Sequence, residues 1–194
     1  MFNAEISAGS LLLPESRRLA RLLLTQPSPE AWRQALYQDN ILQKKPATAK
    51  RQATLIRKRL ETLDAKSWEL IASGDNETAT QLLLAGAIRH SPLLGEYLRT
   101  VYGASLRRLE THLKPHAWES FLADCEQHDP AVSQWAASTR AKLAEVVARI
   151  LVEARYLASS RNRHMTPPML HPVVKQDLVR QGALDTLNVM DFHR

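Results

Sequence analysis

Apolar side chains recur at every third or fourth position over most of this 194-residue chain, which is the spacing of one face of an α-helix. Prolines punctuate the pattern, because proline is tolerated at the first helical position, where its missing N–H group is not needed. The pattern predicts helices over residues 14–25, 29–38, 46–63, 65–73, 76–90, 92–102, 104–112, 115–127, 130–136, 138–157 and 172–181.

Two stretches do not follow the helical pattern. Residues 2–10 are mostly small and polar, and residues 159–171 contain the pair Pro167-Pro168. The second stretch is compatible with a β-hairpin, such as the wing of a winged helix, and also with an ordered loop. A break at His128-Asp129-Pro130 predicts a boundary between an N-terminal helical bundle, residues 1–128, and a smaller C-terminal helical unit, residues 129–194.

Composition supports a helical fold, because 30 Leu and 25 Ala stand against only 6 Ile and 9 Val. We therefore expect an all-α protein. The longest purely apolar stretch, residues 82–88, is far shorter than the roughly 20 residues of a membrane-spanning helix. The single cysteine, Cys125, cannot close an internal disulfide, and the first residues do not resemble a signal peptide. These features predict a cytoplasmic protein that does not enter a membrane.

Positive charge is concentrated in one segment. Residues 40–60 contain seven Lys or Arg and no Asp or Glu, whereas the rest of the chain contains 19 basic and 20 acidic residues. This segment alone accounts for the formal net charge of +6. An excess of this kind favours an acidic partner, although charge alone does not identify the partner.

The predicted helix 46–63 separates its apolar and basic positions. Its apolar stripe is formed by Ala49, Ala53, Ile56, Leu60 and Leu63. At about 100° per residue, Lys50, Arg51, Arg57 and Lys58 project about 80–200° away from Ala49, on a separate arc. A basic face can simply be a solvated surface. The absence of interleaved acidic residues instead favours contact with a polyanion such as a phosphate backbone.

A second basic region lies between residues 138 and 163, with six Arg or Lys against two Glu. The short pattern 130–136, the helix that follows it and the Arg-bearing stretch 161–165 occur in the order of a winged helix-turn-helix unit. This order also arises in ordinary helical proteins, because nothing in the sequence separates a recognition helix from a core helix.

Motifs for catalysis are missing from the sequence. It contains no phosphate-binding loop, dinucleotide-binding turn, nucleophile elbow or zinc-protease helix. The best metal-like cluster is His112, His116, Asp124, Cys125 and His128. Pro115 interrupts this cluster, and Cys125 with His128 lacks the second pair that tetrahedral zinc needs. We expect no catalytic residues, no bound metal, no cofactor and no small-molecule substrate, and therefore a protein that is not an enzyme.

Several segments resemble the BrxA family of bacteriophage exclusion (BREX) systems. In the N-terminal half these segments are Asn3–Leu11, Leu13–Arg17, Asn40–Lys44 and Pro46–Ala53. Further on they are His90–Gly95, Trp118–Leu122 and Ser138–Leu143, and the likeness thins after about Ser159. The resemblance implies a small, non-enzymatic, all-helical protein similar to the NusB fold of antitermination factors. It also implies a role in phage defence, DNA binding, and a genetic setting with a DNA methyltransferase, a large ATPase and a phosphatase-like protein.

The combined prediction is a BREX component that binds double-stranded DNA largely independently of sequence. The predicted DNA contacts are Lys44, Lys45, Lys50, Arg51, Arg57 and Lys58, with Arg140, Lys142, Arg161 and Arg163 as a second set. Two alternatives stay open. The basic face could dock on an acidic surface of the BREX methyltransferase or ATPase, so that the protein is an adaptor, or it could bind RNA as the NusB likeness suggests.

Overall fold

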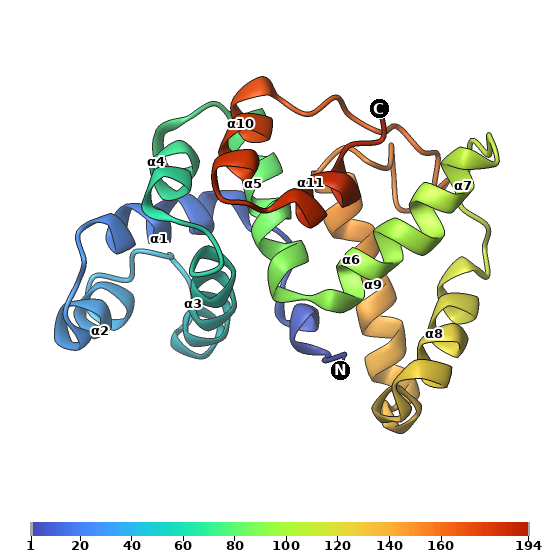
Figure 1. Cartoon of the computed structure of the whole chain (residues 1–194). Helices are drawn as coiled ribbons and strands as arrows, with labels where there is room; N and C mark the ends of the chain where they lie inside the picture. The colour runs from blue at the N-terminus through green and yellow to red at the C-terminus, as the bar shows by residue number, and fades with distance from the viewer. Residues whose placement is uncertain (1, 194) are drawn as a thin grey trace.

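The computed structural model describes residues 2–193, and the prediction of an all-α, multi-helix bundle is confirmed within this range (Figure 1). The N-terminal elements are η1 (Glu5–Ala8), α1 (Leu13–Leu24), α2 (Pro29–Tyr37), α3 (Pro46–Leu60), α4 (Ala65–Ser73) and α5 (Asn76–His90). The central elements are α6 (Pro92–Tyr97), η2 (Leu98–Tyr102), α7 (Gly103–Arg107) and α8 (Ala117–His128). The C-terminal elements are η3 (Pro130–Gln134), α9 (Ala137–Glu153), α10 (Pro172–Arg180) and α11 (Leu184–Met190).

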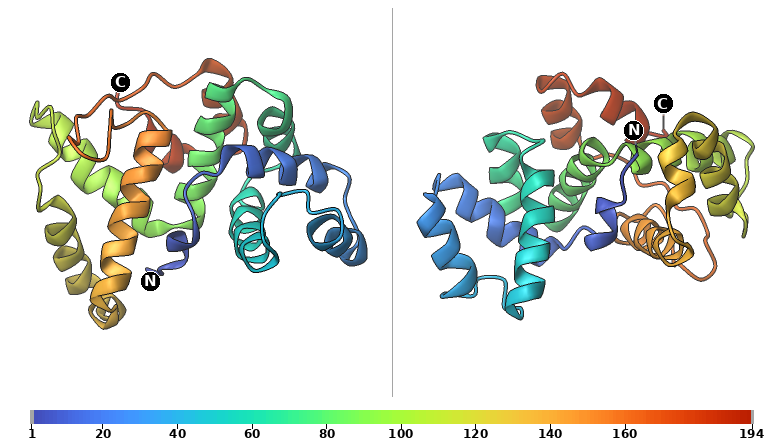
Figure 2. Two further views of the ribbon diagram at one scale, coloured as in Figure 1. Left: turned by 180° about the vertical axis from the view of Figure 1, so that it is seen from behind. Right: turned by 90° about the horizontal axis from the view of Figure 1, so that it is seen from below.

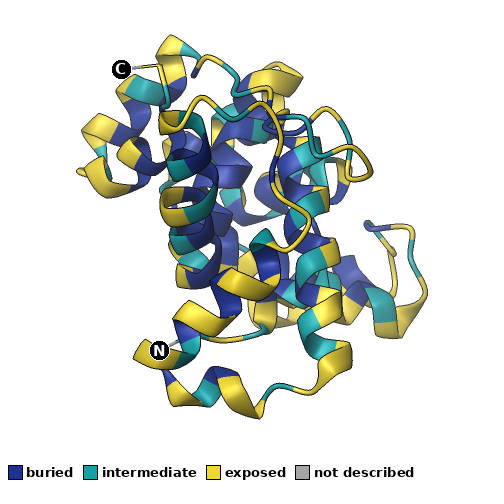
Figure 3. Ribbon diagram, turned by 90° about the vertical axis from the view of Figure 1, so that its right-hand side faces the viewer, coloured by how far each residue is buried: buried dark blue, intermediate teal, exposed yellow. Residues whose placement is uncertain are grey.

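Helix α5 is the centre of the bundle. Its run Leu82–Ile88 is apolar on all sides, and a helix of this kind is stable only when other elements cover it. Helices α1, α3, α4, α6, α10 and α11 all pack against α5, and its run is buried. Figure 3 shows that the buried residues gather in the interior of the bundle and the exposed ones at its edges. At Gly86 an added Cβ would lie 2.9 Å from the carbonyl oxygen of Arg59, so the close crossing of α3 and α5 requires glycine there.

The predicted break at Gly103 is wrong. Elements α6, η2 and α7 form one continuous rod from residue 92 to residue 107, in which η2 is a π-helical turn (Figure 1). Gly103 has ordinary helical angles, φ −64° and ψ −36°, and its missing side chain makes room for Phe192, whose ring would lie 2.9 Å from an added Cβ. Glycine therefore serves packing at this position and does not end the helix.

Several predicted helix ends also differ from the structure. Helix α3 ends at Leu60 instead of residue 63. Helix α9 ends at Glu153 instead of residue 157, because Arg155 adopts a positive φ of 63°, which is incompatible with a continuing α-helix. The predicted helix 104–112 ends at Arg107, and residues 130–136 form the shorter 3₁₀ turn η3. The predictions do not include helix α11. Gly182 lies between α10 and α11 and has a φ of 66°, the left-handed conformation that commonly follows the end of a helix.

The stretch 159–171 is an ordered loop, and among residues 2–193 no β-strand is present. Two isolated antiparallel bridges hold this loop, His112 with His164 and Leu157 with Met165. A single hydrophobic cluster includes buried residues from both sides of position 128, such as Leu122 and Val146. The division into units 1–128 and 129–194, and the helix-turn-helix interpretation of the second unit, stay predictions.

The N-terminal segment lies between α3 and α9 and contacts both helices (Figure 2). Arg59 of α3 is 3% exposed, and its guanidinium donates to the carbonyls of Ser10 at 2.5 Å and Gly9 at 3.0 Å. Burial lowers the pKa of Arg59 to about 10, which leaves it charged at neutral pH. From the other side, Glu153 of α9 accepts the backbone N–H of Leu11 at 2.8 Å. The segment is therefore fixed by polar contacts to two helices that are far apart in sequence.

The part of the chain that the structure describes contains no helix that combines the length and the apolar composition needed to cross a bilayer.

Replacing Arg59 with Met should release the N-terminal segment. The apolar stem stays buried, but the carbonyls of Gly9 and Ser10 lose their charged donor, so we expect the free energy of unfolding to fall by about 2–4 kcal/mol. Urea titration measures this change, and hydrogen exchange at residues 5–11 should accelerate. The control is Arg89→Met, an exposed arginine on α5, for which a change within about 0.5 kcal/mol is expected. An equal effect of both substitutions would contradict the role of Arg59.

Asp64 should contribute an acid-sensitive part of the stability. It caps α4, and its carboxylate pairs with Arg180 of α10 at 2.5 Å, a contact that lowers the pKa of Asp64 from 3.8 to about 2. A lowered pKa means that the contribution is complete above about pH 4 and is lost as pH falls towards 2. Asp64→Asn keeps a capping oxygen, so we expect a loss of at most about 1 kcal/mol at pH 7 because the pair is partly exposed.

The measurement for Asp64 is chemical unfolding at pH 7 and at pH 3. The difference in the free energy of unfolding between the wild type and Asp64→Asn should be smaller at pH 3 than at pH 7. A difference that is equal or larger at pH 3 would show that Arg180 does not stabilise the Asp64 carboxylate.

Candidate nucleic-acid interface

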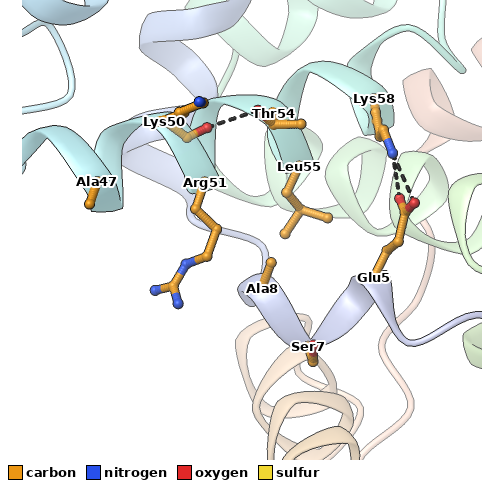
Figure 4. Close-up of a pocket in the computed structure, with 9 residues that line it drawn as sticks. All are labelled: Glu5, Ser7, Ala8, Ala47, Lys50, Arg51, Thr54, Leu55 and Lys58. Atoms are coloured by element: carbon orange, nitrogen blue, oxygen red, sulfur yellow. Dashed lines mark hydrogen bonds and ion pairs between the residues drawn. The ribbon is translucent and has the colours of Figure 1, made fainter.

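Helix α3 presents the basic face that the sequence predicts. Pro46 occupies its first turn, and Ala49, Ala53, Ile56 and Leu60 are all buried, as expected for the apolar stripe. Lys50, Arg51, Arg57 and Lys58 are exposed on the other side of the helix. The structure adds one feature that the stripe does not predict, since Leu55 is also buried, and Figure 4 shows it pointing towards Ala8 of η1.

A groove of about 410 Å³ lies between α3 and η1 (Figure 4). Small or apolar side chains line it, namely Ser7, Ala8, Ala47, Thr54 and Leu55, and its charged lining residues are Glu5, Lys50, Arg51 and Lys58. The hydroxyl of Thr54 donates to the carbonyl of Lys50 at 2.9 Å, so it is already engaged within the helix. The groove therefore combines a small, mostly apolar floor with a basic border.

Three cations of the predicted set have carboxylate partners from outside the segment 40–60. Lys44 pairs with Glu15 at 2.9 Å, Arg57 with Glu61 at 2.7 Å, and Lys58 with Glu5 at 2.7 Å. The guanidinium of Arg57 also lies 4.7 Å from the ring centre of Trp32 on α2, in the geometry of a cation–π contact. The segment 40–60 itself contains no acidic residue, and the carboxylates that pair with it come from α1, η1 and the turn after α3.

The remaining three cations, Lys45, Lys50 and Arg51, have no ion pair with any residue between 2 and 193. All three are exposed, and Figure 4 shows the Arg51 side chain extending away from the helix into the open side of the groove. They are the members of the set whose charge is available to an incoming anion without first breaking a contact.

Glu5 joins the groove to the end of α5. Its carboxylate accepts from Lys58 at 2.7 Å and lies 3.1 Å from the Nε2 atom of His90. The hydrogen bond from Lys58 is the main reason that the pKa of Glu5 is lowered. The pKa of His90 is also lowered, chiefly by burial and then by Arg59, so His90 is mainly neutral at pH 7. Glu5 is thus a carboxylate held against Lys58 by the position of η1.

Two members of the second predicted set, Arg140 and Lys142, lie at the start of α9 and have carboxylate partners. Arg140 is half-buried, pairs with Glu126, and donates to the backbone carbonyls of Trp135 and Val132 at 3.1 Å, which makes it a structural residue of the η3–α9 turn. Lys142 pairs with Glu145 at 2.9 Å.

The other two members of that set lie in the loop 158–166. Arg163 donates to the carbonyl of Pro115 at 2.6 Å, while Arg161 is exposed. Neither has a carboxylate partner among the described residues. The bridge between His112 and His164 places this loop beside residues 107–114, which contain Arg107, Arg108 and Lys114. The sequence offers no signal for this pairing, because the two segments are about 50 residues apart.

Titratable side chains do not gather into a metal site in the described part of the chain, where no group of three or more His, Cys, Asp or Glu is close enough to hold an ion. The rings of His112 and His164 lie in contact, with their centres 4.8 Å apart and their planes tilted by 52°. Burial raises the pKa of the Cys125 thiol to about 11, so at neutral pH it is not the thiolate that a nucleophile or metal ligand requires.

Comparison with known proteins identifies relatives over almost the whole chain. A family model described as BrxA matches residues 1–182. The BREX protein BrxA of Paramagnetospirillum magneticum is 42% identical over 161 residues, which cover 82% of this chain and 81% of the relative. The BREX protein BrxA of Escherichia coli is 33% identical over 191 residues, covering 98% and 90%.

The fold is also similar to a solved structure, the crystal structure of an uncharacterized protein from Magnetospirillum magneticum. The two superpose with a TM-score of 0.91 at 35% sequence identity, and the match covers 98% of each chain. The family match and the alignment with the Escherichia coli relative both span the basic helix α3 and the N-terminal segment that packs on it. The chain therefore belongs to the BrxA family.

Proposed function

We propose that this protein is a cytoplasmic, non-enzymatic component of a BREX phage-defence system that binds double-stranded DNA largely independently of sequence. The observation that carries the proposal is the pair of exposed cations Lys50 and Arg51, which have no ion pair within residues 2–193, on the face of α3 that borders the groove. The BREX setting is supported by the names of the BrxA relatives.

Phosphates would be contacted first by Lys45, Lys50 and Arg51, because these side chains lose no existing ion pair. Lys44, Arg57 and Lys58 can join by exchanging a carboxylate for a phosphate. The pairs of Arg57 and Lys58 are exposed, and exposed ion pairs are worth only about 0–1 kcal/mol, so the exchange costs little there. The Lys44 exchange costs more, because it would leave the largely buried carboxylate of Glu15 without this partner. Lys and Arg contacts of this kind position a protein on the DNA backbone and do not read its sequence.

A second contact would come from Arg161 and Arg163 in the loop 158–166. Arg140 and Lys142 stay in the proposal as weaker members, since Arg140 is engaged with backbone carbonyls and Glu126. If about six phosphates are neutralised in total, the logarithm of the affinity should fall against the logarithm of salt concentration with a slope near −5.

The double substitution Lys50→Ala/Arg51→Ala should weaken binding to duplex DNA and make the salt slope shallower by about 1.8, because two phosphate contacts are lost. Fluorescence anisotropy with a labelled duplex at four salt concentrations measures both quantities, and circular dichroism confirms the fold. The matched control is Lys66→Ala/Arg89→Ala, which removes two exposed cations from α4 and α5 with the same change in net charge. The control slope should equal the wild-type slope.

The same titration separates the alternatives. Equal slopes for the double variant and its control would reject α3 as the phosphate contact. Equally steep slopes on duplex DNA and on structured RNA would favour an RNA-binding protein. No binding by the wild type would overturn DNA binding and leave the adaptor on the BREX methyltransferase or ATPase as the function to test.

Glu5→Gln should strengthen DNA binding, because Lys58 loses its carboxylate partner and becomes free for a phosphate. We expect the salt slope to become steeper by about 0.9, the contribution of one more contact. The control is Glu69→Gln, an exposed glutamate on α4 with the same charge change. Identical affinities for the two variants would mean that only net charge matters and that Lys58 does not reach the DNA.

A further inference from the structure

The turn after α7 exposes a leucine at its tip. Leu109 is 89% exposed, more than any other large apolar residue between positions 2 and 193. Its backbone is in the left-handed region, with φ 59°. The turn projects at the end of the molecule opposite α2, beyond the label of α7 (Figure 1).

Hydrogen bonds identify the turn as a Schellman motif. The N–H of Leu109 donates to the carbonyl of Leu106 at 2.9 Å, and the N–H of Glu110 donates to the carbonyl of Ser105 at 3.0 Å. In this motif the left-handed position is usually glycine, because any Cβ there is strained. The chain places a leucine there, and burial does not offset the strain. Leucine is unfavourable at this position for two reasons, because its Cβ is strained at a positive φ and because its apolar side chain is exposed to water. Backbone strain of this kind is typical of functional positions.

The turn is braced by its neighbours. Thr111 accepts the N–H of Met165 at 2.9 Å, and the N–H of Leu113 donates to the carbonyl of Arg163 at 3.1 Å. Together with the bridge between His112 and His164, these bonds fix residues 111–113 against the loop 158–166. Leu109 is thus an apolar side chain held on a rigid support.

Positive charge surrounds this turn. We call residues 103–116 with residues 158–166 the bridged surface, which contains a single acidic residue, Glu110. Its basic residues are Arg107, Arg108, Lys114, Arg161 and Arg163. Glu110 pairs with Arg108 at 3.0 Å and with Lys114 at 3.3 Å. The other three cations have no carboxylate partner in the described part of the chain.

We propose that Leu109 is a wedge that inserts between base pairs of duplex DNA while the cations of the bridged surface contact the flanking phosphates. This inference rests on the proposed function and adds to it a deformation of the DNA. Apolar side chains inserted from the minor groove partially unstack a base step and kink the duplex, and the energy of unstacking is offset by burial of the wedge between the bases.

Duplex DNA fits this tip better than a protein partner does. Stable protein interfaces need a broad buried patch, but Leu109 has no exposed apolar neighbour on the bridged surface among the large residues described. The other exposed apolar residues, Tyr37, Met169, Val173, Val179 and Leu184, belong to other elements. A base step, in contrast, encloses a single side chain between two flat apolar faces and supplies phosphates on both sides.

The wedge predicts that the protein bends DNA and prefers duplexes that kink easily. A pyrimidine–purine step or a mismatch lowers the energy of unstacking, so affinity should be higher for a duplex with a central mismatch than for a matched one of the same length. The phosphate contacts are unchanged between these duplexes, so their salt slopes should be equal.

The test uses the full chain with Leu109→Gly, Leu109→Ala and the control Met169→Ala, which removes another exposed apolar side chain. Each protein is titrated into duplexes that carry 2-aminopurine at a central TA step, and into duplexes with fluorescent labels at both ends. The wild type and Met169→Ala should brighten 2-aminopurine and shorten the end-to-end distance. Both Leu109 variants should lose these signals and bind about tenfold more weakly with an unchanged salt slope.

Leu109→Gly distinguishes a DNA contact of the leucine side chain from a role of this residue in stabilising the fold. Because glycine relieves the left-handed strain, this variant should melt about 1–3 °C higher than the wild type while binding less tightly. Wild-type binding with a normal salt slope but without any dependence on Leu109 would overturn the wedge and leave the proposed function standing. Absence of DNA binding by the wild type would overturn both. Loss of phage resistance in Leu109→Gly with DNA binding intact would assign the leucine to a protein partner and reject the wedge.

Discussion

The arrangement of the basic face depends on the hydrogen bonds that the buried guanidinium of Arg59 donates. The guanidinium holds the carbonyls of Gly9 and Ser10, and these contacts keep η1 against α3. The position of η1 in turn covers Leu55, forms one wall of the groove and sets Glu5 beside Lys58. A charged group that is 3% exposed is expensive to bury, and here it is tolerated because the segment it holds supplies two carbonyl acceptors and lies near Glu153.

The positive charge of the segment 40–60 is partly neutralised in the folded protein. The segment 40–60 is purely basic, yet half of its predicted contacts meet carboxylates from other elements. The basic face therefore has a small open part, Lys45, Lys50 and Arg51, and a part that an anion reaches only by exchange. Such a division lowers affinity for weak or isolated anions more than for a polyanion, because only a polyanion engages enough sites together to displace the carboxylates.

The helical fold was predictable because periodic apolar positions and proline starts are local signals. The buried stripe of α3 and the all-α class follow from them directly. Features that depend on tertiary contact were not predictable. Gly103 suggests a break, but its small size accommodates Phe192 from the end of the chain. The partners of Lys44 and Lys58 lie 29 and 53 residues away, and the bridge from His112 to His164 spans 52 residues. No local pattern encodes such distances.

The π-helical turn η2 gives the rod 92–107 a register that an uninterrupted α-helix would not have. Each residue in an α-helix rotates the following chain by about 100°. The wider turn at Leu98–Tyr102 therefore sets the rotation of the following residues about the helix axis. It determines which way Gly103 faces, beside Phe192, and which way the tip at Leu109 faces. One residue fewer in this turn would swing the tip away from the loop 158–166. The length of the chain between Leu98 and Tyr102 is thus a determinant of the bridged surface, although none of these five residues belongs to it.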